Sequence, residues 1–82
     1  MGFIFENINV DEIKPCLENN KKYDQKEIDT LAESIRICGL VQPIALNKDN
    51  VVIDGHCRLL AVKQLGMKEV RCMRFVLNGE II

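Results

Sequence analysis

The chain contains several short stretches in which hydrophobic and polar residues follow strand-like patterns. Residues 3–8 alternate loosely and predict a first strand, and residues 70–76 predict a late one. Residues 51–53 are β-branched throughout, which favours another strand. The turn-rich residues 47–50 separate them from a short apolar run at residues 44–46, so the two runs predict a hairpin.

Two stretches carry helical spacing instead. Asp24 and Glu27 fit a capping box, and Gly39 suits the left-handed position that closes a helix. Between them the apolar residues of one helical face are Ile28, Leu31, Ala32, Ile35 and Cys38. A second helical pattern runs through Arg58, Ala61, Val62 and Leu65, and stops at Gly66. Asn78 and Gly79 predict a short terminal hairpin through residue 82.

The resulting order, β-α-β-β-α-β, predicts a small α+β domain with helices packed on a sheet. With 82 residues of which 48% are hydrophobic, we expect residues 1–82 to form a single domain. No apolar run approaches the roughly 18 residues that span a membrane. Residues 1–6 also lack the basic start of a signal peptide, so we expect a cytoplasmic protein without membrane partners.

Charge and cysteine content narrow the classes of function. A net charge of −1 is too little for strong sequence-independent DNA binding, although residues 56–74 hold five basic residues and one acid. The four cysteines lie far apart without a C-x-x-C pair, so we expect reduced thiols and neither zinc nor haem. Cys38 and Cys72 fall on apolar patterns and are predicted to lie in the core.

The strongest candidate site is the segment Asp54-Gly55-His56-Cys57-Arg58, where a strand turns into a helix. The first turn of a helix has backbone N–H groups without internal partners, at the positive end of the helix dipole. Gly55 allows a tight turn and the close approach of an anion, and Arg58 can clamp phosphate oxygens. The segment therefore predicts a phosphate-binding site at the helix start.

Other roles for these residues stay open. Asp54 either caps the helix or helps to bind a magnesium ion carried by a nucleotide, and Arg58 fits a surface salt bridge as well as a phosphate clamp. His56 is a donor to an anion or an acid–base group, so His56 and Asp54 are the weak catalytic candidates. Cys57 is either a reactive thiol at a helix start or an inert small residue.

The order of several motifs resembles the ParB/sulfiredoxin-like superfamily, often labelled ParB-like nuclease, over residues 13–75. The matching motifs are Ile13-Lys14-Pro15, Leu31-Ala32-Glu33-Ser34-Ile35, Gly39-Leu40-Val41-Gln42-Pro43-Ile44, Val52-Ile53-Asp54-Gly55-His56-Cys57-Arg58, Ala61 and Leu65-Gly66. The box is similar to the Asp-Gly-His-x-Arg box of a short phage or mobile-element variant. This resemblance implies a mixed sheet.

The resemblance also implies a ligand. Members of the superfamily bind nucleoside di- or triphosphates at the turn between strand and helix. Carried onto this chain, the phosphate-binding residues are Gly55, His56, Cys57 and Arg58, with Asn20 and Lys21 in a second phosphate-contacting segment and Gln42 and Pro43 near the same cleft. The implied cofactor is CTP, ATP or ADP with magnesium.

Two departures from the family patterns limit the implied chemistry. Partition proteins of this superfamily usually carry Gly-Glu-Arg-Arg where this chain has residues 55–58, so the box does not fix CTP as the nucleotide. Sulfiredoxins place a catalytic cysteine before the histidine, whereas His56 precedes Cys57 here. We therefore do not expect sulfinic-acid reductase activity.

Three functions follow as hypotheses. The first is a nucleotide-binding regulatory module of a DNA-associated partition, transcription-regulator or phage protein, which contacts DNA through another domain, subunit or partner and is open to forming a homodimer. The second is a nuclease or phosphotransferase that uses His56 or Asp54. The third is a protein-interaction module with a vestigial site, in which Arg71 and Arg74 contact the partner.

Overall fold

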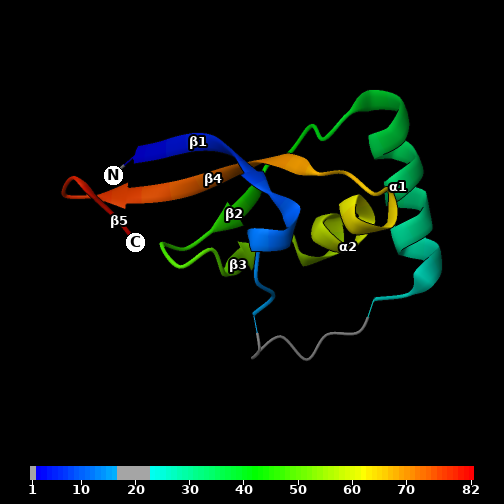
Figure 1. The fold of residues 1–82 in the computed structure, drawn as a ribbon, viewed down its shortest axis with the longest axis horizontal. Coiled ribbons are helices and arrows are strands. Elements are labelled where there is room, and N and C mark those ends of the chain that lie inside the picture. Colours follow the sequence, from blue (N-terminus) through cyan, green and yellow to red (C-terminus); the bar gives the residue numbers. More distant parts are fainter. Residues whose placement is uncertain (1, 17–22) are drawn as a thin grey trace.

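The computed structural model describes residues 2–16 and 23–82, and Figure 1 shows their arrangement. Along the chain the elements are β1 (Gly2–Asn9), the 3₁₀ helix η1 (Val10–Glu12), α1 (Gln25–Cys38), β2 (Ile44–Leu46), β3 (Val52–Asp54), α2 (His56–Gln64), β4 (Glu69–Leu77) and β5 (Glu80–Ile81). This order confirms the α+β prediction, with η1 as the element that the sequence pattern did not indicate. Among the described residues, no helix is both long and apolar enough to cross a membrane.

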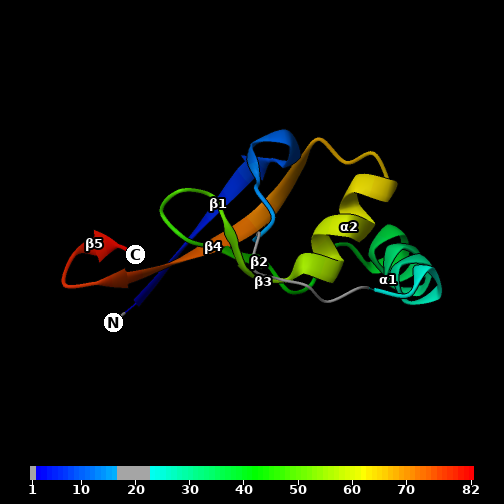
Figure 2. The same cartoon turned by 90° about the horizontal axis from the view of Figure 1, so that it is seen from below.

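The strands form one mixed sheet in the order β1-β4-β2-β3, with β5 also paired to β4. β4 runs antiparallel to β1 and parallel to β2, while β2 and β3 form the predicted antiparallel hairpin. β1 and β4 pair along their whole lengths, from Gly2 opposite Val76 to Asn9 opposite Glu69. The resulting two-stranded ribbon reaches away from the helices, as both views show (Figures 1 and 2).

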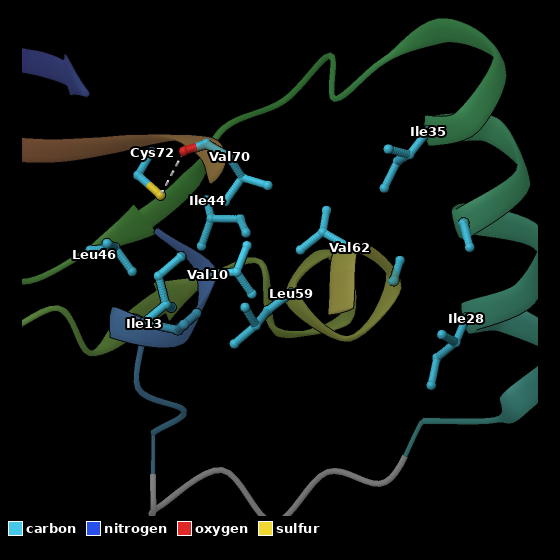
Figure 3. Packing of buried hydrophobic residues seen from close by; sticks show 13 residues of the cluster. Val10, Ile13, Ile28, Ile35, Ile44, Leu46, Leu59, Val62, Val70 and Cys72 are labelled. Atoms are coloured by element: carbon cyan, nitrogen blue, oxygen red, sulfur yellow. Dashed lines mark hydrogen bonds between the residues drawn. The ribbon is translucent and has the colours of Figure 1, made fainter. Parts of the chain in front are cut away.

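The core lies between one face of this sheet, η1 and α2, and α1 packs against α2 (Figure 3). Its buried residues are Val10, Ile13, Ile28, Ala32, Ile35, Ile44, Leu46, Val52, Leu59, Ala61, Val62, Val70 and Cys72. Burying one large aliphatic side chain in this way stabilises a fold by about 1.5–3 kcal/mol. The alternation along β4 sends Val70 and Cys72 into the core and leaves Arg71 exposed.

Helix α1 begins as the sequence predicts. The Asp24 carboxylate accepts a hydrogen bond from the backbone N–H of Lys26 at 3.2 Å, which satisfies one free donor of the first turn. On the exposed side, Asp29 accepts from Gln25 and Gln64, each at 2.8 Å, which ties α1 to α2. These two amide donors lower the pKa of Asp29, with the bond from Gln25 as the larger cause.

Two cysteine predictions have opposite outcomes. Cys72 is fully buried, and this burial raises the pKa of its thiol to about 11. Cys38 was predicted in the core and is exposed, so that prediction is wrong. The reason is that Cys38 is the last residue of α1, one turn beyond Ile35, which is the last buried residue of the helix.

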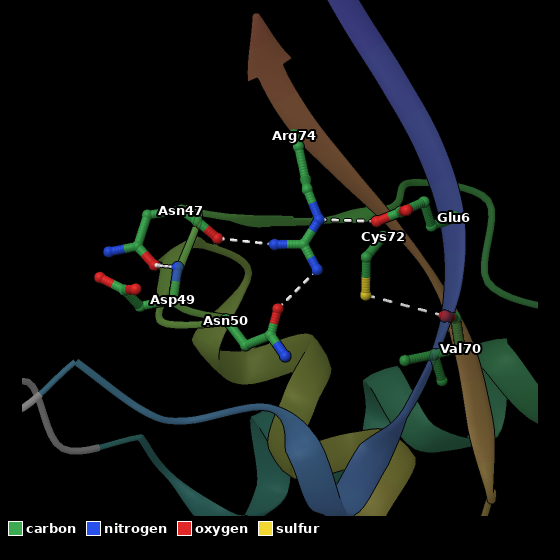
Figure 4. Close-up of polar contacts among 7 residues, drawn as sticks. All are labelled: Glu6, Asn47, Asp49, Asn50, Val70, Cys72 and Arg74. Carbon is green, nitrogen blue, oxygen red and sulfur yellow. Dashed lines mark hydrogen bonds and ion pairs between the residues drawn. The ribbon is translucent and has the colours of Figure 1, made fainter. Parts of the chain in front are cut away.

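The hypothesis that Arg74 is an exposed partner contact is also wrong, because its side chain is buried inside a polar cluster (Figure 4). Its Nε donates to Glu6 on β1 at 2.6 Å, while its terminal nitrogens donate to the Asn47 carbonyl at 2.7 Å and to Asn50 Oδ1 at 2.5 Å. Asn50 has a positive φ of 64°, in the turn between β2 and β3. Arg74 therefore fastens this turn to the β1–β4 ribbon.

Candidate functional site

Gly55 is the residue at which β3 ends and α2 begins. It has φ 106° and ψ 28°, a left-handed conformation that residues with a side chain rarely adopt. Gly55 is the N-cap of α2, and no side chain caps the first turn. Asp54 therefore precedes the cap, which rules out the capping role that the sequence left open for it. The first hydrogen bond of the helix runs from the Leu59 N–H to the Gly55 carbonyl at 2.9 Å. The backbone N–H groups of residues 56–58 therefore have no partner within the helix.

Arg58 lies directly against this turn. Its Nη1 donates to the Pro43 carbonyl at 2.8 Å, and its Nη2 lies 3.7 Å from Asp54 Oδ2. A Cβ built on Gly55 would lie 3.1 Å from Arg58 Nη1, so any other residue here would crowd the guanidinium. The Asp54 side chain is 77% exposed, so this carboxylate does not lock Arg58 into the interior of the domain.

His56 lies on the other side of the helix start. Its Nε2 accepts a hydrogen bond from the backbone N–H of Cys16 at 3.3 Å. Because an accepting nitrogen carries no proton, the neutral ring in this arrangement has its proton on Nδ1. His56 therefore ties the start of α2 to the segment that follows η1, and its other nitrogen is left as a donor.

Two hollows adjoin His56. The larger, about 550 Å³, lies towards β3 and the turn before it, and the smaller, about 200 Å³, lies along α2. Both are lined by Cys16, Tyr23 and His56, and the larger one also by Asn47 and residues 51–53. The surface beside the helix start is therefore concave and has an aromatic wall, which suits a small organic ligand.

The structure brings together part of the predicted site. Arg58 bonds the Pro43 carbonyl and lies beside Gly55, and Gln42 is an exposed residue next to Pro43. Cys57 is half-buried and packs against the core. The predicted phosphate-contacting residues Asn20 and Lys21 lie outside the described residues.

Sequence reasoning missed Cys16 and Tyr23. The bond between Cys16 and His56 joins residues 40 positions apart, so no local spacing signals it. Tyr23 is the single tyrosine of the chain and directly precedes the helix cap Asp24, which was the one available signal.

The described residues of the site do not form a metal-binding cluster by themselves. Over residues 2–16 and 23–82 no three His, Cys, Asp or Glu side chains gather closely enough to hold a metal ion. Asp54 is a single exposed carboxylate at the helix start. Because Mg²⁺ is usually bound by one or two carboxylates together with substrate phosphates, Asp54 alone does not make a metal site.

The sequence comparisons identify the family. The model of the ParB N-terminal domain matches residues 3–79, so the chain belongs to this family. A probable chromosome-partitioning protein ParB of Campylobacter jejuni is 45% identical over 67 residues, which cover 77% of this chain and 24% of that protein. The ParB-like nuclease domain-containing protein YnaK of Escherichia coli is 29% identical over 68 residues, which cover 83% and 76%. The chain thus spans about a quarter of the first relative.

Solved structures place the fold in the ParB/sulfiredoxin-like superfamily. A truncated ParB of Caulobacter crescentus in complex with CTP-γ-S superposes with a TM-score of 0.80 at 20% identity, over 90% of this chain and 45% of that chain. Sulfiredoxin of Arabidopsis thaliana gives 0.73 at 28% identity, over 84% and 81%. A free serine kinase in complex with AMP gives 0.67 at 28% identity, over 90% and 31%.

Proposed function

We propose that this domain binds a nucleoside di- or triphosphate at the start of α2, as a regulatory module of a DNA-associated protein. The observation that carries the proposal is the turn at Gly55. A left-handed glycine without a side-chain cap opens the first turn of α2, and the guanidinium of Arg58 lies beside it. Backbone donors and a fixed cation at one helix start are what a phosphate group requires.

Each residue of the box has a distinct part in this proposal. The N–H groups of His56 and Cys57 face the phosphate together with the Nδ1 proton of His56, whereas the Cys57 side chain stays against the core. Arg58 keeps its bond to Pro43 through Nη1 and offers its remaining donors. Asp54 supplies one ligand to the magnesium ion that accompanies the phosphates.

Residues around the box complete the proposed site. Asn20 and Lys21, which lie outside the described residues, are further candidates for phosphate contacts, and Gln42, an exposed residue next to Pro43, is a candidate neighbour of the ligand. The hollows lined by Tyr23 and His56 give the rest of the nucleotide a place next to its phosphates. Contact with DNA is made through another domain, subunit or partner, because the chain has a net charge of −1.

The comparisons support this proposal from two directions. The free serine kinase, which is 28% identical to this chain, was solved with AMP, and a variant of that kinase was solved with ADP. The relative from Campylobacter jejuni is a probable chromosome-partitioning protein. An adenosine nucleotide in a partition-type protein is therefore the first ligand class to test.

Isothermal titration of the folded domain with CTP, ATP, ADP and GTP, each with magnesium, tests the proposal. We expect heat of binding with at least one nucleotide, and about a 10- to 100-fold loss of affinity in Arg58→Ala, because a charge-assisted hydrogen bond contributes about 1.5–3 kcal/mol. Lys68→Ala, which removes an exposed cation beyond the end of α2, is the matched control and should bind normally. Absence of heat with all four nucleotides would overturn the proposal.

A further inference from the structure

The two edges of the sheet differ in what covers them. β3 forms one edge, where the Lys14 N–H donates to the Asn50 carbonyl at 2.8 Å and the Val52 N–H donates to the Lys14 carbonyl at 2.9 Å. β1 forms the opposite edge (Figure 1). Within residues 2–16 and 23–82, the only strand paired with β1 is β4, and no segment bonds to the other side of β1. In the described structure the sheet is therefore open at β1.

The strand register shows which backbone groups of β1 face the open edge. In an antiparallel pair, the N–H and C=O groups of successive residues turn alternately towards the partner strand and away from it. The Val10 N–H donates to the Lys68 carbonyl at 2.8 Å, and this pair extends the β1–β4 register by one residue. The even-numbered residues of β1 therefore bond to β4, whereas Phe3, Phe5 and Asn7 turn their backbone groups outwards. The open edge thus presents one N–H and one C=O group at each of these residues.

β1 lacks the features that keep edge strands from pairing with other chains. Protected edge strands are usually short or bulged, or they carry lysine or proline. β1 is eight residues long, contains no lysine, arginine or proline, and pairs with β4 without a shift in register. Its one charged residue, Glu6, is held by Arg74 at 2.6 Å. A long edge of this kind is a template for a further strand.

The side chains next to the free backbone groups favour a particular kind of strand. Phe3 is 57% exposed and Phe5 51%. The Arg71 guanidinium lies 4.5 Å from the Phe5 ring centroid, so this side chain reaches from β4 across to β1. Within the described residues, Arg71 forms no ion pair with a carboxylate. An added strand would therefore meet two aromatic rings and one cation on the same face of the sheet.

We propose that the β1 edge binds an extended peptide of a partner protein, which adds to the sheet as an antiparallel strand. The peptide carries an acidic residue opposite Asn7, where its carboxylate pairs with Arg71. Apolar residues follow at alternate positions, opposite Phe5 and Phe3. The backbone bonds give the affinity, and the alternate side chains give the selectivity. We expect a dissociation constant of about 10–100 µM, because a short strand on an open edge forms few bonds and fills no deep pocket.

Fluorescence anisotropy with a fluorescein-labelled peptide, Ser-Asp-Thr-Val-Thr-Val-Ser, tests the proposal with the domain titrated to about 1 mM. N-methylation of the first valine should weaken binding by more than about 10-fold, because it removes the donor that faces the Phe5 carbonyl and blocks close pairing. N-methylation of the threonine that follows is the matched control, since its N–H points away from β1. Absence of binding, or equal effects of the two methyl groups, would overturn the proposal.

The charge preference is tested with a second peptide in which asparagine replaces the aspartate. Arg71→Ala should bind the aspartate peptide about 2- to 5-fold more weakly and should bind the asparagine peptide normally, because an exposed ion pair contributes little. Arg36→Ala, which removes an exposed arginine on α1, should leave both affinities unchanged. An equal loss with both peptides in Arg71→Ala would overturn the assignment of an acidic partner.

Hydrogen–deuterium exchange read by NMR locates the bound strand. The amides of Phe3, Phe5 and Asn7 should exchange rapidly in the free domain and slowly with the peptide bound, whereas the even-numbered amides of β1 are protected in both states. Protection of these three amides without peptide would mean that another segment or a second copy already occupies the edge, which would overturn the proposal. β1 and the start of α2 lie at opposite edges of the sheet, so peptide binding and nucleotide titration give independent answers.

Discussion

Replacement of Gly55 by alanine tests the most specific geometric feature of the site. The backbone cost comes first, since φ is 106° and a left-handed conformation costs an L-residue roughly 1–2 kcal/mol. The added Cβ would also lie 3.1 Å from Arg58 Nη1 and 3.4 Å from Ile44 Cα. If it displaces Arg58 from the Pro43 carbonyl, the loss of that charged hydrogen bond adds about 1.5–3 kcal/mol.

The expected total for Gly55→Ala is therefore about 2.5–5 kcal/mol in the free energy of unfolding. Gly66→Ala is the matched control, because Gly66 also has a positive φ, 72°, but nothing lies within 4 Å of the position that its new methyl group would take. Gly66→Ala should show only the cost of the left-handed backbone, about 1–2 kcal/mol. Urea denaturation followed by circular dichroism at 222 nm measures both, and the domain has no tryptophan to serve as a fluorescent probe.

The difference in the free energy of unfolding between the two variants measures the cost of crowding Arg58. Equal losses in Gly55→Ala and Gly66→Ala would refute the reasoning, because the guanidinium would then have room to move aside without cost. The Gly55→Ala variant should also lose nucleotide affinity in the titration, since the phosphate and the new methyl group compete for the space above the helix start.

Three further predictions concern other parts of the molecule. Arg74→Ala should lower the free energy of unfolding by about 2–4 kcal/mol in urea, because it leaves the Glu6 carboxylate without its cation, whereas Lys48→Ala in the same turn should change it by less than about 0.5 kcal/mol. Burial raises the pKa of the Cys72 thiol from 9.0 to about 11, so the thiol loses its proton at a lower pH in the unfolded chain than in the folded domain. The contribution of the protonated thiol to the free energy of unfolding is therefore complete below pH 9 and is lost as the pH rises to about 11, which urea denaturation at a series of pH values across that range will measure. The neutral His56 ring should carry its proton on Nδ1, and long-range ¹⁵N–¹H correlation spectra that show the Nε2-protonated form instead would contradict the bond from Cys16.

The sequence predicted most of the fold because its signals are local. The cap at Asp24, the positive-φ glycines at residues 39 and 66 and the Asn-Gly turn at residues 78–79 each mark a boundary that the structure confirms. The helical start at Gly55 follows from the same chemistry. Alternation also put Cys72 correctly in the core.

The predictions failed where the outcome depends on distant residues. Arg74 looks like a surface cation in the sequence, and its burial depends on Glu6 and on the Asn47 turn, which are far from it along the chain. The same holds for the contact between Cys16 and His56. Cys38 lies on the apolar face of α1 by its spacing, but the spacing does not show how far along α1 the packing against α2 extends.

The pairing of β1 with β4 has a consequence for biosynthesis. β1 leaves the ribosome before β4, and its partner strand is complete only when Leu77 has been made. During that interval β1 has no strand to pair with. The sheet can form only after residues separated by most of the domain's length come together. Until the last residues of β4 emerge, a nascent chain therefore exposes the unpaired β1 segment, to which chaperones can bind.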